Sequence, residues 1–337
     1  MIGVLGPVVL AFVVAFVTAG IVMQARILDH PNARSNHCRP TPRGGGLGIV
    51  VGFLAALCVI PMDAPHEAAA LAGLGGCAAL AAALGFLDDV QTLSERFKFG
   101  CLTLISLTLA GMAGPVTELG IALPWVVGWL GSALFVFTLA NTVNFMDGSD
   151  GLMAATLIPA ALALAWLAPG AIGLGALGLA GALAGFAVWN APLVAARGRL
   201  FSGDVGSLGT AVIFAGLALA WTSTGPAGSV WLAPLLVLPL LGDVLLTMAA
   251  RVRAGRSPFV AHRAHAYQLL LMMGASHRKV AMIWGGMSFL CGALALLATA
   301  LPPTLSPVIL VAAILFFTWQ HRRWRKSARE AGHDILQ

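Results

Sequence analysis

The chain has 337 residues, of which 59% are hydrophobic and only 9% are charged. Soluble domains carry about 25% charged residues, and disordered chains have low hydrophobicity. Both classes are therefore excluded, and the mean hydropathy of +0.92 indicates a polytopic membrane protein.

Eleven apolar stretches reach or approach the roughly 20 residues that a helix needs to cross the hydrocarbon core. In chain order they are 2–23, 45–62, 68–87, 97–113, 121–140, 152–168, 171–189, 206–222, 230–249, 280–301 and 305–320. The sequence thus predicts an all-α bundle of about eleven transmembrane helices, with ten as the main alternative. We expect a single catalytic domain over residues 1–320 and a basic cytoplasmic tail over 321–337.

The 19 Lys and Arg residues all fall in alternate loops and in the tail of this arrangement. The positive-inside rule assigns that side to the cytoplasm, which places the N-terminus outside and the C-terminus inside. Ten spans would leave both termini on one side, so the charges favour eleven. We expect the basic tail to contact anionic lipid.

The first cytoplasmic loop contains Asp29, a Pro-Asn-x-Arg sequence at 31–34 and Thr-Pro-Arg-Gly-Gly-Gly at 41–46. Glycines let backbone N–H groups approach a phosphate, and arginines such as Arg43 neutralise it. A Pro/Gly-broken connector whose arginines simply follow the positive-inside rule explains the same residues. The loop alone leaves both interpretations open.

Asp88 and Asp89 end the third predicted span. Adjacent carboxylates at the edge of a membrane helix repel each other and are costly to desolvate. A Mg²⁺ ion would relieve this repulsion, since it binds one or two carboxylates together with phosphate oxygens. The alternative is a solvated pair at the interface.

Two further cytoplasmic loops combine acidic residues with glycines. Residues 141–152 read Asn-Thr-Val-Asn-Phe-Met-Asp-Gly-Ser-Asp-Gly-Leu, which suits either a cradle for a polar ligand or a turn with Asx hydrogen bonds. Residues 201–207 read Phe-Ser-Gly-Asp-Val-Gly-Ser, in which Asp204 is either a helix cap or a metal ligand.

The fifth cytoplasmic loop carries His262 and His265, which are spaced to share one helix face. The alternative is a basic amphipathic connector at the membrane surface. Asp243 lies within the ninth predicted span, where an ionisable group indicates a function unless a polar neighbour pairs with it.

In this order, the motifs resemble the polyprenyl-phosphate N-acetylhexosamine-1-phosphate transferases, the MraY/WecA family of glycosyltransferase 4. The resemblance extends from about Asp29 to Gln268 and uses all five cytoplasmic loops. It implies transfer of a sugar 1-phosphate from a UDP-N-acetylhexosamine to undecaprenyl phosphate, with release of UMP, at the cytoplasmic face of the bacterial inner membrane. It also implies a Mg²⁺ cofactor that Mn²⁺ can replace. The partners it implies are membrane lipids and, in a possible homodimer, a second copy of the chain, with no nucleic acid.

The resemblance also implies roles for individual residues. Those matched to catalysis are Asp88, Asp89, Asp204 and His265, with Asp89 and Asp204 as the Mg²⁺ ligands and Asp88 as a base or phosphate-activating group. Those matched to substrate binding are Arg43, Lys98, Asn141, Asn144, Asp147, Asp150, Asn190 and Arg263.

Two departures from the family pattern are present. His265-Ala266-Tyr267-Gln268 stands where the family has His-x-His-His. This variant looks most like the WbpL-type branch, which starts O-antigen synthesis with N-acetylglucosamine or a 6-deoxy relative. The segment from Asn190 to Asp204 is also several residues longer than usual, because of Ala-Ala-Arg-Gly at 195–198.

Two other classes of membrane protein are alternatives to this family. A transporter or flippase for an anionic or lipid-linked solute would place its polar site near the midplane, often between two related halves. Here only Asp243 lies deep and no halves match. A CDP-alcohol phosphotransferase would gather its Asp residues in one motif, whereas this chain distributes them over several loops.

Overall fold

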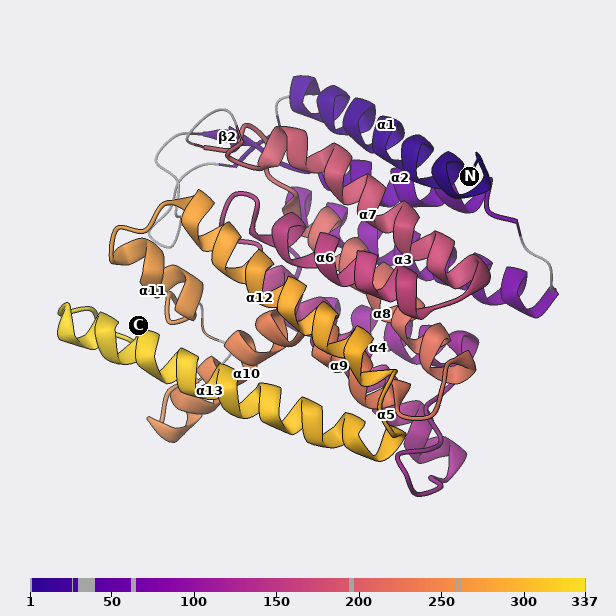
Figure 1. Cartoon of the computed structure of the whole chain (residues 1–337). Coiled ribbons are helices and arrows are strands. Elements are labelled where there is room, and N and C mark those ends of the chain that lie inside the picture. Colours follow the sequence, from indigo (N-terminus) through magenta and orange to yellow (C-terminus); the bar gives the residue numbers. More distant parts are fainter. Residues whose placement is uncertain are drawn as a thin grey trace.

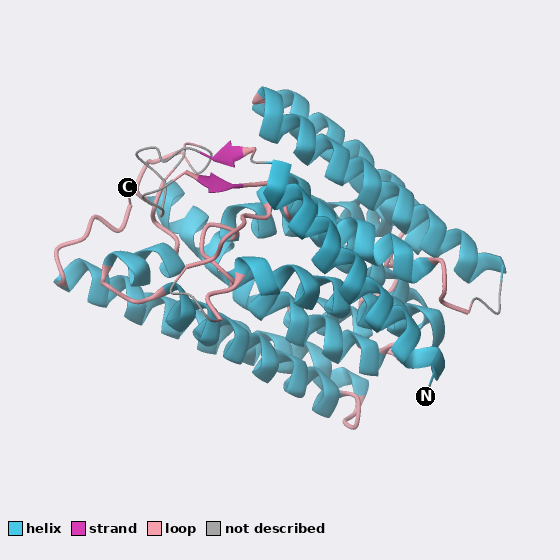
Figure 2. Ribbon diagram, turned by 90° about the horizontal axis from the view of Figure 1, so that it is seen from above, coloured by secondary structure: helices cyan, strands magenta, loops and turns pink. Residues whose placement is uncertain are grey.

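The computed structural model describes residues 2–25, 27–29, 40–61, 65–193, 197–257, 260 and 262–336. Parts of two predicted segments lie outside these residues: Pro31, Asn32 and Arg34 of the first loop, and Ala195 and Ala196 before Asp204. The described chain is almost entirely helical (Figures 1 and 2).

The helices are α1 (Ile2–Ala25), α2 (Leu47–Leu57), α3 (Pro65–Gln91), α4 (Glu95–Ala113), α5 (Trp125–Met146), α6 (Leu152–Leu167), α7 (Gly170–Asn190), α8 (Gly203–Thr224), α9 (Ser229–Leu236), α10 (Leu238–Arg253), α11 (Ala266–Met272), α12 (His277–Ala298) and α13 (Ser306–Glu330). A 3-10 turn, η1 (Pro303–Leu305), precedes α13. Two short strands, β1 (Leu28–Asp29) and β2 (Thr41–Pro42), pair antiparallel.

The prediction of an all-α polytopic membrane protein is confirmed. Eight of the described helices are long and apolar enough to cross a membrane, or nine if α9 and α10, which meet at 76°, form one broken span. The helices α2 and α6 coincide with predicted spans, but at 11 and 16 residues they are shorter than the roughly 20 required. The count of eleven and the orientation of the termini therefore stay predictions.

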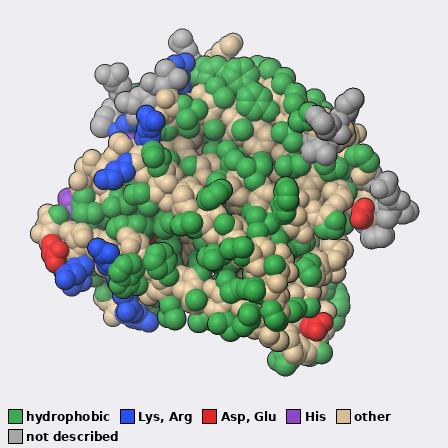
Figure 3. Space-filling model, in the orientation of Figure 1, with side chains coloured by type: hydrophobic (Ala, Val, Ile, Leu, Met, Phe, Trp, Pro, Cys, Tyr) green, Lys and Arg blue, Asp and Glu red, His purple; other side chains and the backbone are tan. Residues whose placement is uncertain are grey.

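Polar and apolar side chains are segregated on the surface (Figure 3). On the face shown, hydrophobic side chains cover the middle of the molecule, and Lys and Arg gather at the end where α11 and the C-terminus lie. Figures 1 and 2 agree that α1 begins and α13 ends at opposite ends of the bundle. The helix α13 continues to Glu330, so the predicted boundary at residue 320 lies inside one helix.

The helix α8 lies in the centre of the bundle. Every residue from Val205 to Trp221 on it is buried. A helix that is apolar on all sides needs neighbours around its whole circumference, and small residues let those neighbours approach closely in a membrane protein. The helices α2, α3, α4, α5 and α7 all contact it. The first turn of α8 carries the Gly-Asp-Val-Gly-Ser motif into the middle of the other helices.

The helix α3 approaches the start of α8 closely at Gly85. A Cβ atom at this position would lie 2.3 Å from the carbonyl oxygen of Asp204. Only glycine therefore allows the two backbones to meet here. The crossing brings Asp88 and Asp89, one turn further along α3, to the level of Asp204.

We expect Gly85→Ala to separate α3 from α8 and to lower the free energy of unfolding by about 1–3 kcal/mol, as overpacking does. Thermal unfolding in detergent measures this change. Gly76→Ala is the matched control on the same helix, because a Cβ there meets nothing within 4 Å. Equal melting temperatures for the two variants would contradict the close crossing.

Candidate active site

Backbone hydrogen bonds join the segment before α2 to the segment before α8. Phe201 N donates to the carbonyl of Pro42 at 2.8 Å, and Gly45 N donates to the carbonyl of Phe201 at 2.9 Å. Gly46 N donates in turn to the carbonyl of Ser202 at 3.0 Å. The Thr-Pro-Arg-Gly-Gly-Gly and Gly-Asp-Val-Gly-Ser motifs, about 160 positions apart, therefore form one wall of the site.

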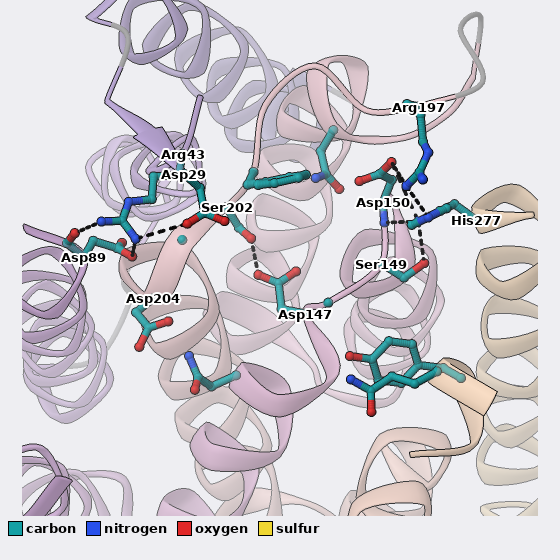
Figure 4. A pocket seen from close by; sticks show the side chains of 17 residues that line it. Asp29, Arg43, Asp89, Asp147, Ser149, Asp150, Arg197, Ser202, Asp204 and His277 are labelled. Atoms are coloured by element: carbon teal, nitrogen blue, oxygen red, sulfur yellow. Dashed lines mark hydrogen bonds and ion pairs between the residues drawn. The ribbon is translucent and has the colours of Figure 1, made fainter. Parts of the chain in front are cut away.

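This wall borders a cavity of about 320 Å³, shown from close by in Figure 4. Its described lining comprises Asp29, Arg43, Asp89, Asn144, Asp147, Gly148, Ser149, Asp150, Asn190, Arg197, Phe201, Ser202, Gly203, Asp204, Tyr267, Gln268 and His277. These residues come from β1, α3, α5, α7, α8, α11, α12 and the loops between them. The structure thus brings together most of the predicted site residues.

Lys98 connects three helices at the acidic end of the cavity. Its Nζ lies 2.7 Å from Asp88 Oδ2 and 3.0 Å from Asp204 Oδ2. The other Asp88 oxygen, Oδ1, accepts a hydrogen bond from Leu93 N at 2.8 Å. Both oxygens of Asp88 are therefore occupied, and Asp88 holds Lys98 against Asp204.

Asp89 is buried and faces the N-terminus of α8. Its Oδ2 accepts a hydrogen bond from Val205 N at 3.3 Å, and its Oδ1 lies 3.8 Å from Arg43 Nη1. Arg43 also donates to the backbone carbonyl of Asp89 and lies 3.7 Å from Asp29 Oδ1. A guanidinium and a helix N-terminus, both of which attract anions, thus meet at this carboxylate.

The opposite end of the cavity is built around Asp150 and His277. His277 Nδ1 accepts a hydrogen bond from the backbone N–H of Asp150 at 3.0 Å and lies 3.0 Å from Ser149 Oγ. Asp150 Oδ2 accepts from Gly198 N at 3.0 Å and lies 3.9 Å from Arg197 Nη1. Arg197 also contacts His277 Nε2. Figure 4 shows this group well apart from Asp89 and Arg43.

Sequence reasoning missed His277 and Arg197 as site residues. His277 begins a helix that was predicted to start three residues later, and Arg197 was counted only as a topological charge. The unusually long segment before Asp204 was the available signal, because it supplies both Arg197 and Gly198 to Asp150.

Asp147 lies between the two ends, directly after α5. It is half-buried, and its carboxylate accepts a hydrogen bond from the hydroxyl of Ser202. Desolvation and the neighbouring negative charges of Asp204, Asp89 and Asp150 together raise the pKa of Asp147 to about 8, although the hydrogen bond from Ser202 lowers it. The cavity therefore concentrates negative charge before any anionic ligand enters.

A raised pKa makes the native state bind a proton that the unfolded state releases, so stability falls as pH rises from about 4 to about 8. We expect Asp147→Asn, which keeps an acceptor for Ser202, to remove this loss. In a chelator, the melting temperature of the variant should exceed that of wild type more at pH 8 than at pH 5. If the difference in melting temperature between the variant and wild type did not change with pH, the raised pKa would not belong to Asp147.

The three predicted Asn residues have different roles in the structure. Asn141 and Asn144 lie in the last turns of α5 and not in a loop, since the loop begins at Asp147. Asn144 lines the cavity and donates to Ser207 Oγ at 2.9 Å. Asn141 instead donates to a carbonyl of its own helix.

Asn190, at the end of α7, holds two loops together. Its Oδ1 accepts from Gly151 N at 2.9 Å, and its Nδ2 donates to the carbonyl of Leu200 at 3.0 Å. It lines the cavity while fixing the Asp150 segment to the segment before α8.

His265 and Arg263 are not among the described residues that line the cavity. His262 and His265 precede α11, so the predicted shared helix face is wrong, although their rings lie 4.8 Å apart. His265 is buried, with Nδ1 at 3.8 Å from Asp243 Oδ1. Two residues further along, Tyr267 does line the cavity, and burial raises the pKa of its phenol, which keeps it protonated.

The charge of the lining indicates which ions the site can hold. The described lining contains five Asp but only two Arg, with Lys98 behind Asp204 as a third cation. No three His, Cys, Asp or Glu side chains in the described part of the chain form a complete metal cage. Mg²⁺ in phosphoryl-transfer sites needs only one or two carboxylates plus substrate phosphates, so Asp89 and Asp204 fit that ion.

Comparisons with known proteins agree with this geometry. Residues 71–222 match the model of glycosyl transferase family 4. A decaprenyl-phosphate N-acetylglucosaminephosphotransferase of Mycobacterium tuberculosis is 31% identical over 319 residues, covering 81% of this chain and 76% of the relative. An undecaprenyl-phosphate alpha-N-acetylglucosaminyl 1-phosphate transferase of Yersinia pestis is 27% identical over 285 residues, covering 78% and 74%. Its counterpart in Escherichia coli O157:H7 is 24% identical over 330 residues, covering 93% and 89%.

Proposed function

Because the chain belongs to glycosyl transferase family 4, within the polyprenyl-phosphate N-acetylhexosamine-1-phosphate transferases, we propose that it transfers N-acetylglucosamine 1-phosphate, or that of a 6-deoxy relative, from a UDP-sugar to undecaprenyl phosphate. The products are undecaprenyl-diphospho-sugar and UMP. One observation carries the proposal: a single cavity joins the Asp89, Asp204 and Lys98 group to the segment from Asn144 to Asp150.

The reaction exchanges one phosphoanhydride bond for another. An oxygen of the lipid phosphate attacks the β-phosphorus of the UDP-sugar, and the bond between that phosphorus and the bridging oxygen to the α-phosphorus breaks. The bridging oxygen and its electron pair leave with UMP. A phosphate monoester has a second pKa near 6, so at neutral pH the attacking oxygen already carries its charge and needs no base.

The residues of the acidic end therefore act mainly by neutralising and positioning charge. Lys98 and Arg43 offer positive charge at opposite sides of Asp89 and Asp204. The N-terminus of α8 adds backbone N–H groups that favour an anion. Asp88, whose oxygens are both occupied, serves to hold Lys98 in this position.

We propose that Asp89 and Asp204 hold Mg²⁺, for which Mn²⁺ can substitute. The ion supplies Lewis-acid charge to the diphosphate of the donor. The acidic lining supports this assignment, because an anionic substrate would otherwise meet a cavity lined by five Asp side chains. The charges of Asp204, Asp89 and Asp150 also contribute, after desolvation, to the raised pKa of Asp147.

The other end of the cavity suits the nucleoside. Asp150 and Ser149 offer acceptors and a hydroxyl, and Arg197 and His277 surround them. Polar groups fixed by one another in a pocket give orientation and specificity to a bound ligand. With the phosphates near Asp89 and Asp204, we propose that the uridine lies toward Asp150.

The acceptor lipid sets where the site must lie. Its phosphate is at the membrane interface, so we propose eleven spans with the cavity on the cytoplasmic face of the bacterial inner membrane, the N-terminus outside and the C-terminus inside. The placement of all 19 Lys and Arg on one side supports this topology. The His265-Ala266-Tyr267-Gln268 variant supports a role in starting O-antigen or another envelope glycan.

A panel of UDP-sugars tests the proposal. Purified protein is incubated with undecaprenyl phosphate, Mg²⁺ and UDP-N-acetylglucosamine, a 6-deoxy relative, UDP-N-acetylgalactosamine or UDP-glucose, and UMP is measured. We expect release with one of the first two and none without the lipid. Lipid-independent release of UMP, or none with any sugar, would contradict the proposal.

A further inference from the structure

Asp243 is a buried carboxylate that the proposed reaction does not use. It lies in the second turn of α10, just after the 76° bend from α9, and its exposed fraction is 0%. It is not among the described residues that line the cavity. An ionisable group at such a position is costly, so its partners indicate its purpose.

The carboxylate of Asp243 binds the backbone at the start of α11. Oδ1 accepts a hydrogen bond from Ala266 N at 2.8 Å, and Oδ2 accepts one from Tyr267 N at 3.3 Å. His265 Nδ1 lies 3.8 Å from Oδ1. The residue therefore fixes the His265–Tyr267 segment through its main chain, independently of the side chains that the segment carries.

The far side of this segment forms part of the cavity wall. The phenol of Tyr267 lines the cavity and donates to the carbonyl of Phe145 at 3.2 Å. A Cβ at Gly148 would lie 2.2 Å from the Tyr267 hydroxyl, so the ring packs directly on the α5–α6 loop. Phe145 and Gly148, which make these two contacts, directly follow Asn144 and Asp147 in the sequence.

The helix α13 contacts both Asp243 and the segment before α11. His321 Nε2 lies 3.3 Å from Asp243 Oδ1, and Thr247 Oγ1 donates to that oxygen at 3.2 Å. One turn further along α13, Arg325 donates to the carbonyl of Ala264 at 3.0 Å and to that of Ile335 at 2.7 Å. Arg325 is buried, which differs from the lipid-facing tail that the sequence predicted.

We propose that Asp243 is a positioning residue for the transfer reaction. Held by His321 and Thr247, it sets the backbone of Ala266 and Tyr267, and through the Tyr267 phenol it sets the loop that carries Asp147 and Asp150. The inference rests on the proposed function, because the loop matters only if that cavity binds the donor. In this role, α10 and α13 position residues of the site although neither Asp243 nor His321 touches the substrate.

A double-mutant cycle of Asp243→Asn and Tyr267→Phe tests the inference. The first change keeps the size of the side chain but removes its charge and one acceptor, and the second removes the hydroxyl that contacts Phe145 and Gly148. We expect Asp243→Asn to lower kcat about 10-fold or more with a smaller change in KM, since misplacement of about 1 Å in a site can cost about 100-fold.

The two effects should be strongly non-additive, because both variants act through one contact. Melting temperatures are recorded for every variant, and Glu330→Gln, an exposed carboxylate-to-amide change on α13, is the matched control. If Asp243→Asn does not fold, His321→Gln replaces it in the same cycle, since His321 contacts Asp243 and leaves both backbone bonds in place.

The inference is overturned if wild type is active and the effects of the two substitutions on kcat are additive. It is also overturned if the kcat of Asp243→Asn is within twofold of that of wild type. Either result leaves the proposed function intact. A wild type that releases no UMP from any UDP-sugar overturns the proposed function itself. Non-additive losses of kcat, with unchanged melting temperatures and an unaffected Glu330→Gln control, support the positioning role.

Discussion

Asp204→Asn should lower the rate of UMP release by about 10³-fold while the protein stays folded. Asp204 faces the cavity from the first turn of α8, accepts from Lys98 at 3.0 Å, and is one of the two carboxylates proposed to hold Mg²⁺. The amide is nearly the same size but carries no charge, so it would hold Mg²⁺ weakly and the diphosphate of the donor would lose the charge that the ion supplies.

The measurement for Asp204→Asn is kcat across a Mg²⁺ titration, together with the melting temperature. The exposed Glu118 supplies the control, since Glu118→Gln makes the same chemical change outside the cavity lining that the structure describes. A folded Asp204→Asn protein that keeps a rate near that of wild type would show that this carboxylate does not hold the ion.

Lys98→Met should be the second most damaging change, with UMP release reduced about 100-fold or more. Lys98 is the cation that separates Asp88 from Asp204, at 2.7 Å and 3.0 Å. Its removal leaves two largely buried carboxylates facing each other without compensation. Breaking a buried ion pair in this way also costs about 3 kcal/mol of stability, so the melting temperature should fall.

Two variants complete the Lys98 experiment. Arg96→Met removes an exposed cation two residues earlier and should leave the rate and the melting temperature close to those of wild type. Lys98→Met combined with Asp88→Asn should recover stability but not activity, because the uncompensated charge is gone while the cation remains absent. Recovery of activity in the double variant would contradict the role given to Lys98.

The sequence predicted the fold class because it depends on composition and on the length of apolar stretches, which are local properties. It could not settle the number of spans, since α2 and α6 lie within predicted apolar stretches but have only 11 and 16 residues. The bend between α9 and α10 was also missed, because one continuous apolar stretch covers both helices.

Most candidate site residues were predicted from motif chemistry, but their partners were not. Lys98 meets Asp204, 106 positions away, only because Gly85 lets α3 approach α8. His277 gave no local signal, as a histidine at the start of an apolar helix is unremarkable until Asp150 is seen beside it. Such contacts depend on how helices cross, which the periodicity of one chain does not encode.

One cation of the basic tail differs from the prediction that the tail contacts lipid. Arg325 is buried and donates to the carbonyls of Ala264 and Ile335. The long side chain of arginine can satisfy several carbonyl groups at once, and only the packing of α13 shows which ones.

Following the β-phosphorus of the donor tests the central claim most directly. UDP-N-acetylglucosamine is labelled with ³²P at either the α- or the β-position and incubated with the protein, undecaprenyl phosphate and Mg²⁺, and the lipid is extracted. Transfer of a sugar 1-phosphate predicts that the β-label enters the lipid while the α-label stays in water as UMP. A β-label that remains in water as UDP, with or without sugar on the lipid, would contradict it.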